Sequence, residues 1–174
     1  MPFFIWSAEG CSAAVRATGE LEMKILDVLP RDAILIDLEA QEKKGILEEL
    51  AAPISRISGI CHQNLVEVLM ERERLGSTGI GGGIGIPHGK VKGLNSLILG
   101  FGLSRNGVNF DSMDGKPTHI FFLLLTPENS AGDHLKLLAR ISRILKNDPF
   151  KERLIVAQSK EEVYDIIQDD DDEF

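Results

Sequence analysis

Cysteine is scarce in this chain of 174 residues, and the two cysteines form no pattern. Cys11 and Cys61 lie far apart, without a CxxC pair or the dense spacing of a disulfide-rich protein. A disulfide framework and a zinc site are therefore not indicated, and we expect no bound metal. A reducing cytoplasm suits such a chain best.

Long hydrophobic runs and excess positive charge are also missing. No run approaches the roughly 18 apolar residues of a membrane-spanning helix, and the apolar first residues lack the basic segment of a signal peptide. The formal net charge of −8 argues against nucleic acid, because binding to its phosphates requires clustered Lys and Arg. We therefore expect neither membrane insertion nor a nucleic-acid partner.

The length suits one well-packed domain and is short for two. Residues 1–22 show no clear period, and Met23 begins a segment that reads as a natural start. We interpret 1–22 as an N-terminal extension, either poorly ordered or an ordinary helix. One α/β domain is expected over 23–168, and the acidic end, 169–174, is interpreted as a solvated tail.

Helical and strand patterns alternate within this domain. Segments 96–103 and 119–126 are nearly continuous apolar runs, typical of strands buried on both faces, and Asn106-Gly107 is a turn signal between them. Other expected elements are a short strand at 33–38 and helices at 41–52 (ended by Pro53), at 64–73, at 134–145 and after Ser159. The pattern predicts an α/β single-domain sandwich, with a central mixed β-sheet flanked by helices on both faces.

The most unusual stretch is the glycine-rich run 76–90, in which a single histidine, His88, directly follows Pro87. Successive glycine N–H groups can form a concave surface that binds an anion. From Arg72 to Lys92 the charged residues give a local excess of three positive charges in an acidic protein. We interpret the run as a phosphate-binding site.

The run does not match the familiar nucleotide-binding loops. A Walker loop would need glycine at position 84 and a hydroxyl after Lys90, where the chain has Ile84 and Val91. A dinucleotide fingerprint would need its last glycine at position 84, 86 or 88, which hold Ile84, Ile86 and His88. We therefore expect no nucleotide cofactor.

A histidine in a phosphate-binding pocket has a chemistry of its own. Neutral imidazole, with an ordinary pKa of about 6.5, is largely unprotonated near pH 7 and can attack phosphorus. A phosphorylated imidazole is also a good leaving group. Because phosphoryl transfer depends mainly on in-line positioning and charge neutralisation, His88 with a nearby arginine suits a phosphoryl carrier.

The run 75–90, preceded by Arg72 and Glu73, resembles the active-site signature of the type 2 (fructose/mannitol) IIA proteins of the bacterial phosphoenolpyruvate-dependent phosphotransferase system. The similarity covers about residues 23–167 and is greatest to the nitrogen-regulatory members. One position departs from the signature, because the residue two before the proline is usually alanine and is Gly85 in this chain.

The resemblance implies roles for individual residues. The histidine of the Ile-Pro-His-Gly element, which takes the phosphoryl group, corresponds to His88. The family's arginine sixteen residues earlier corresponds to Arg72, and its second pocket histidine, at the start of a later helix, corresponds to His134.

Contacts to the phosphate are expected from residues near His88 in the sequence, namely Ser77, Thr78, Gly79 and Gly89. The hydroxyls of Ser77 and Thr78 either donate to the phosphoryl oxygens or make a local turn.

Each assignment has a structural alternative. His88 is alternatively a loop histidine, Arg72 an ordinary charge at a helix C-terminus, and His134 a packed histidine on an apolar helical stripe. We interpret His62 and His119 as structural residues.

The resemblance predicts a phosphotransferase component with a phosphohistidine intermediate, which accepts phosphoryl on His88 from an HPr-type phosphocarrier protein in a nitrogen-regulatory, signalling branch. Its acceptor would be a IIB domain or a regulatory target protein. Alternatives are a sugar-transport IIA component that passes phosphoryl to a fructose/mannitol-type IIB domain, and a purely regulatory protein-binding module. A metal hydrolase using His88 and His134 would need carboxylates, of which only Asp133 is close in sequence.

Overall fold

The computed structural model describes residues 22–173, so the expected extension 1–22 lies, apart from Glu22, outside the described part. The elements in chain order are η1 (Ile25–Asp27), η2 (Arg31–Ala33), β1 (Ile34–Leu35), α1 (Lys43–Ser58), α2 (His62–Arg74), β2 (Gly79–Gly81), β3 (Ile84–Gly85), β4 (His88–Val91), β5 (Ile98–Val108), β6 (Thr118–Pro127), α3 (Ala131–Ile144), α4 (Asp148–Val156) and α5 (Lys160–Asp172). Across residues 22–173, no helix combines the length and the apolar character needed to cross a bilayer.

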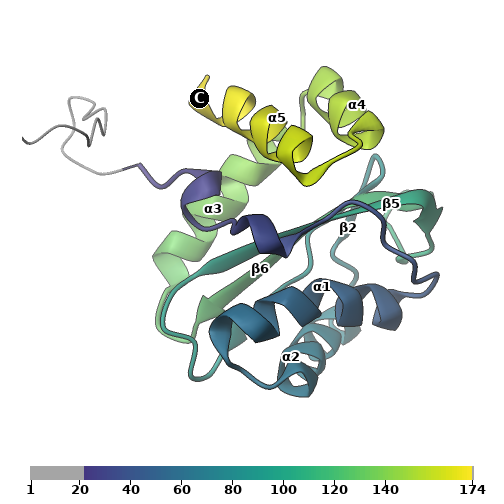
Figure 1. The fold of residues 1–174 in the computed structure, drawn as a ribbon. Helices are drawn as coiled ribbons and strands as arrows, with labels where there is room; N and C mark the ends of the chain where they lie inside the picture. Colours follow the sequence, from purple (N-terminus) through teal and green to yellow (C-terminus); the bar gives the residue numbers. More distant parts are fainter. Residues whose placement is uncertain (1–21, 174) are drawn as a thin grey trace, which may run out of the picture.

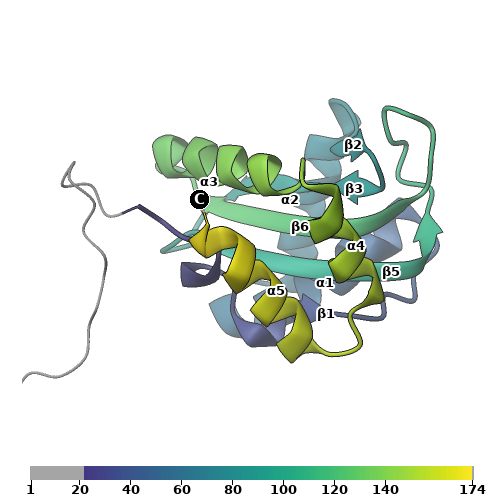
Figure 2. The ribbon, with the colours of Figure 1, turned by 90° about the horizontal axis from the view of Figure 1, so that it is seen from above.

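The described residues are built around a six-stranded mixed sheet. Its order is β1-β5-β6-β3-β2, and β4 also pairs with β6. β5 and β6 are antiparallel, whereas β1 joins β5, and β3 and β4 join β6, in parallel. Helices α1 and α2 cover one face, and α3, α4 and α5 cover the other (Figures 1 and 2). The predicted sandwich with helices on both faces is confirmed.

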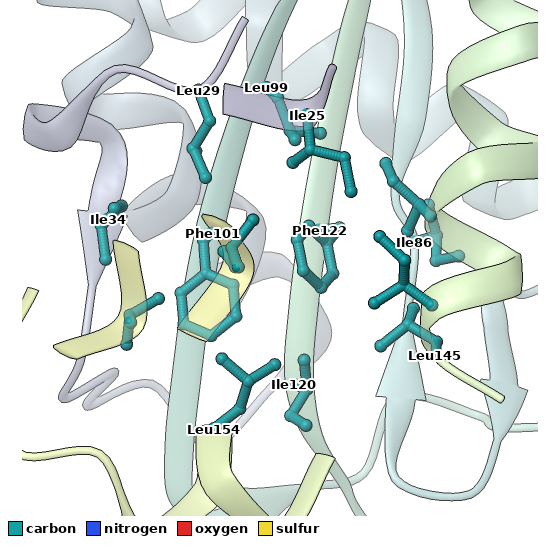
Figure 3. Packing of buried hydrophobic residues seen from close by; sticks show 14 of the residues in the cluster. Ile25, Leu29, Ile34, Ile86, Leu99, Phe101, Ile120, Phe122, Leu145 and Leu154 are labelled. Carbon is teal, nitrogen blue, oxygen red and sulfur yellow. The ribbon is translucent and has the colours of Figure 1, made fainter. Parts of the chain in front are cut away.

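The two long strands bury aromatic rings on both faces of the sheet. Phe101 and Phe122 meet edge to face on the side of α3, α4 and α5, with 5.2 Å between ring centroids (Figure 3). Phe110 and Phe121 do the same on the side of α1 and α2, at 5.1 Å. Since neighbouring residues of a strand point to opposite faces, a sheet covered on both sides requires the continuous apolar runs seen in the sequence.

Pro53 does not end the first helix, contrary to the prediction. α1 continues through Pro53 to Ser58 and ends at Gly59, which has a left-handed φ of 75°. A proline inside a helix costs about 3 kcal/mol, mainly through a lost backbone hydrogen bond and a clash with the preceding turn. Burial of Ile54 beside Gly100 of the sheet, worth roughly 1.5–3 kcal/mol, offsets much of that cost.

One further local prediction is wrong, and one expected strand is shorter than predicted. The expected turn at Asn106-Gly107 lies inside β5, where Gly107 has a φ of 77° and the pairing with β6 shifts register between Leu103 and Val108. A bulge of this kind needs glycine for the same reason that a turn does, so the sequence signal is ambiguous. The strand expected at 33–38 is reduced to the two residues of β1.

The acidic C-terminal segment is not the solvated tail that the sequence suggested. It forms the end of α5, and Asp170 and Asp171 are buried, with exposures of 3% and 1%. Asp171 accepts hydrogen bonds from the guanidinium of Arg140 and, at 2.8 Å, from the N–H of Ile25, while Asp170 pairs with Arg153. Buried carboxylates require such partners, which only the folded chain supplies.

We expect Asp171→Ala to lower the free energy of unfolding by about 3–5 kcal/mol, because it removes the buried carboxylate that pairs with Arg140 and leaves only the exposed carboxylate of Glu22 beside this buried arginine. Asp169→Ala, at an exposed position of the same helix, should change it by less than about 0.5 kcal/mol. Urea denaturation followed by circular dichroism measures both values. Equally small effects would contradict a structural role for Asp171.

Candidate active site

A surface hollow of about 580 Å³ lies where α2, β4 and α3 meet. It is lined by Val68, Glu71, Arg72, Leu75, His88, Gly89, Lys90 and His134. The structure therefore brings together His88, Arg72 and His134, which the sequence places on three separate elements.

Each of these three residues is held by regular structure. His88 begins β4 and aligns with Leu124 of β6. Arg72 lies in the last turn of α2, and His134 lies in the first turn of α3. Pro87 has no N–H to donate, so it separates β3 from β4 along the same side of β6 and places His88 at a strand start.

Gly89 allows α2 to approach β4 closely. A Cβ at Gly89 would come within 2.7 Å of Cγ1 of Val68, a distance that real contacts do not reach. Glycine is therefore required at this position for the packing that carries Arg72 to His88. The role shown for Gly89 is this close approach, in addition to its place in the lining of the hollow.

The ring of His88 is half-buried and contacted at both nitrogens. Nδ1 lies 2.8 Å from the carbonyl oxygen of Ile86, and Nε2 lies 3.3 Å from Nε of Arg72. A carbonyl oxygen can only accept a hydrogen bond and a guanidinium can only donate one. Both contacts therefore require the neutral tautomer that carries its proton on Nδ1 and leaves a lone pair on Nε2.

The guanidinium of Arg72 is held from two sides. Its Nη1 donates to the carbonyl oxygen of Gly76 at 2.9 Å, and its Nε donates to His88. A planar group with fixed donors is well suited to phosphoryl oxygens. The arrangement places a permanent positive charge directly beside Nε2 of His88.

His134 packs its ring against His88. The ring centroids are 5.4 Å apart at an interplanar angle of 63°, and His134 is 9% exposed. Burial lowers the pKa of His134, and repulsion from Lys90 and from a protonated His88 would lower it further. Its Nδ1 is buried without a hydrogen-bond partner among the described residues. Its surroundings therefore favour the neutral form of His134.

Three of the residues expected to hold phosphate lie elsewhere. The hydroxyl of Ser77 donates to the carbonyl of Phe110 at 2.7 Å and accepts from the N–H of Gly79 at 3.0 Å. The hydroxyl of Thr78 donates to the carboxylate of Glu73. The open glycine cradle predicted from the sequence is corrected to a hairpin of β2 and β3, whose N–H groups are used in strand pairing and by neighbouring side chains.

Gly85, which departs from the family signature, lies in the β3 strand. It pairs with Gly79 on one side and with Phe121 on the other. A Cβ at Gly85 would come within 3.1 Å of the Phe121 ring, so glycine suits the packing of this chain.

Lys90 also lies at the site, although the sequence pointed to it only as one of several local positive charges. It lines the hollow and lies two residues after His88 in β4. Residues i and i+2 of a strand share a face, so this spacing was the available signal.

The other two histidines lie outside this hollow, and each contacts a backbone carbonyl, in keeping with the structural interpretation. Nε2 of His62 contacts the carbonyl of Glu48 at 2.8 Å, and Nδ1 of His119 contacts that of Ser104 at 2.9 Å. Within residues 22–173, no three His, Cys, Asp or Glu side chains gather closely enough to hold a metal ion.

The sequence matches the family described as "Phosphoenolpyruvate-dependent sugar phosphotransferase system, EIIA 2" over residues 27–170. The chain belongs to this family. It is 39% identical over 145 residues to the nitrogen regulatory protein of Bradyrhizobium diazoefficiens, an alignment that covers 83% of this chain and 95% of the relative. It is 34% identical over 146 residues to the fructose-specific EIIA component of Haloferax volcanii, covering 82% of this chain and 94% of the relative.

The fold of this IIA protein agrees with that of a solved relative. The crystal structure of nitrogen regulatory protein IIA-Ntr from Neisseria meningitidis superimposes with a TM-score of 0.77 at 38% identity, covering 81% of this chain and 97% of the other. The resemblance carried by the signature around His88 is thus confirmed. With it comes the general role of a phosphotransferase-system IIA component, which accepts phosphoryl groups.

We expect His134 to titrate below the ordinary histidine pKa of about 6.5 and to be uncharged at pH 7. Lys90→Gln should raise the pKa of His134 toward the ordinary value, because it removes a nearby positive charge. Lys92→Gln, an exposed lysine in the same segment, should leave it unchanged. Titration of the His134 ring signals by NMR measures its pKa in the wild type and in both variants. Equal pKa values in the two variants would show that Lys90 does not act on His134.

Proposed function

We propose that this IIA protein is a histidine phosphocarrier that accepts phosphoryl on Nε2 of His88 from an HPr-type phosphocarrier protein. The observation that carries the proposal is the single tautomer of His88, with its Nε2 lone pair beside the guanidinium of Arg72. This is the arrangement that a nucleophilic nitrogen needs when the incoming group is an anion.

The proposed transfer is one displacement at phosphorus. The lone pair of Nε2 forms the new N–P bond as the bond between phosphorus and the donor's histidine nitrogen breaks. No proton has to leave Nε2, since the ring proton is on Nδ1. The carbonyl of Ile86 keeps its hydrogen bond to Nδ1–H and stabilises the positive charge that develops on the ring.

Arg72 would change partners during the step. In this structure its Nε–H lies on the lone pair that must attack, so the guanidinium has to turn from Nε2 toward the phosphoryl oxygens. Lys90, on the same face of β4, adds positive charge at the edge of the hollow. Together these groups would neutralise the equatorial oxygens in the transition state.

His134 would act as a neutral neighbour of the reacting ring. It packs against His88, and a ring N–H of an uncharged His134 can still donate to a phosphoryl oxygen. A second imidazolium would repel the charge that develops on His88. The lowered pKa of His134 therefore favours the transfer.

We further propose that the protein acts in the cytoplasm, in a nitrogen-regulatory branch, and hands its signal or its phosphoryl group to a regulatory target protein. The support is the similarity to a nitrogen regulatory protein over nearly the whole of that relative. The second candidate, transport of sugar through a IIB domain, is supported by the fructose-specific relative. If a target protein bound stably to both the phosphorylated and the unphosphorylated protein, a regulatory binding module would be favoured over a phosphoryl carrier.

His88→Ala should abolish labelling by phosphoenolpyruvate and the upstream phosphotransferase proteins, because it removes the accepting nitrogen. His62→Gln, which changes a structural histidine outside the hollow, should retain labelling. Intact-mass spectrometry under alkaline conditions, which preserve the N–P bond, measures the added phosphoryl group. Full labelling of His88→Ala would overturn the proposal.

Arg72→Ala should fold but accept phosphoryl about 10²–10³-fold more slowly, as for loss of one charge-stabilising group. Arg74→Ala removes an exposed arginine from the same helix turn and should transfer at the wild-type rate. Rapid-quench measurement of the transfer rate compares the two. Equal rates in Arg72→Ala and the wild type would remove Arg72 from the mechanism.

A further inference from the structure

Beside Arg72 in α2 lies a buried carboxylate for which the proposed transfer has no use. The side chain of Glu73 is 2% exposed. It accepts hydrogen bonds from the hydroxyl of Thr78 and from the Thr78 N–H, which lies 3.3 Å from each carboxylate oxygen. It also lies 3.2 Å from Nζ of Lys43, which comes from α1. Glu73 thus joins two helices to the segment that leads into β2.

The partner of Glu73 keeps its charge. Burial opposes the charge on Lys43, but hydrogen bonds to Asp111 and Glu73 outweigh burial and raise its pKa. Its Nζ lies 2.9 Å from the exposed carboxylate of Asp111 and 5.1 Å from the ring centroid of Phe110. Because removing the charge of Glu73 from water is costly, its pair with the partly buried Lys43 stabilises the fold little compared with apolar residues of the same size. The Glu73–Lys43 pair is better explained by a role in positioning the residues around it.

One chain of contacts leads from Glu73 to the ring of His88. Glu73 holds the N–H of Thr78, and the carbonyl of Thr78 accepts from the N–H of Ile86 at 3.0 Å. The carbonyl of Ile86 in turn accepts from Nδ1 of His88 at 2.8 Å. A displacement of Thr78 would therefore move the group that orients the ring and selects its tautomer.

A second chain leads from Glu73 to the guanidinium of Arg72. The carbonyl of Glu73 accepts from the N–H of Gly76 at 3.1 Å, while its carboxylate holds Thr78 two residues further on. The segment between them presents the carbonyl of Gly76 to Nη1 of Arg72 at 2.9 Å. The same residue thus holds both ends of the loop that fixes the arginine.

We infer that Glu73, with Thr78 and Lys43, is a positioning residue. It holds the His88 ring and the Arg72 guanidinium in the relative position that transfer requires. The inference rests on the proposed function of His88. Glu73 touches neither reacting atom and acts only through Thr78 and the loop at Gly76. Reactions of this type are sensitive to misplacement by as little as about 1 Å, which can cost on the order of 10²-fold in rate.

The test compares two buried carboxylates of similar setting. Glu73→Gln keeps the size of the side chain but removes its charge and turns an amide donor toward Thr78 or Lys43. Asp170→Asn does the same to a 3% exposed carboxylate paired with Arg153 on the opposite face of the sheet from α2. Thr78→Val, which removes one hydroxyl, is a milder change in the same cluster.

With a phosphorylated HPr-type protein as the varied substrate, we expect Glu73→Gln to lower kcat about 10–100-fold with little change in KM. Thr78→Val should change kcat in the same direction by less, and Asp170→Asn should keep the wild-type kcat. In the unphosphorylated proteins, the imidazole nitrogen signals of His88 should shift from the Nδ1–H tautomer toward a mixture in Glu73→Gln but not in Asp170→Asn.

The inference requires that Glu73→Gln both lowers kcat and shifts the nitrogen signals of His88. A wild-type kcat in Glu73→Gln, unchanged His88 nitrogen signals, or an equal loss of kcat in Asp170→Asn would each overturn the inference. If the wild-type protein were not labelled on His88, the proposed function would fail. The nitrogen signals, which need no transfer, would still decide whether Glu73 positions the ring.

Discussion

The hydrogen bond between Nδ1 of His88 and the carbonyl of Ile86 decides which ring nitrogen carries the lone pair that faces Arg72. An imidazole that could rotate or exchange tautomers would present this nitrogen to the hollow only part of the time. Here the backbone of the residue before Pro87 supplies the acceptor, and Arg72 supplies the matching donor on the other side. The rest of the site holds these two contacts in place.

The sheet and its helices hold the ring of His88 in place through close packing that leaves no room for a side chain at Gly89. β4 is anchored by parallel pairing with the buried strand β6, and α2 reaches β4 only because Gly89 lacks a side chain. Glycine in this region therefore serves close packing and a tight hairpin more than direct binding of an anion. Elements on three sides form a hollow at the surface of the protein.

Charge is distributed unevenly over the molecule. The chain as a whole carries a formal charge of −8, yet Arg72 and Lys90 lie beside His88. Several acids are neutralised internally, with Glu73 held by Lys43 and Asp171 by Arg140. A local positive site in an acidic protein suits the approach of an anionic phosphoryl group at short range.

The amino-acid sequence by itself determined the class of fold, because the apolar runs of β5 and β6 suit only a sheet covered on both faces. It also determined the candidates His88, Arg72 and His134, because a contiguous signature and a helical stripe are local patterns. Only the tertiary structure decided that the hydroxyls of Ser77 and Thr78 donate to Phe110 and Glu73 and that α1 continues through Pro53. It alone brought Lys43 to Glu73 and Arg140 to Asp171. The physical reason is that a buried charge, or a break in a helix, is stable only with partners from distant segments, and those partners leave no periodic pattern in the local sequence.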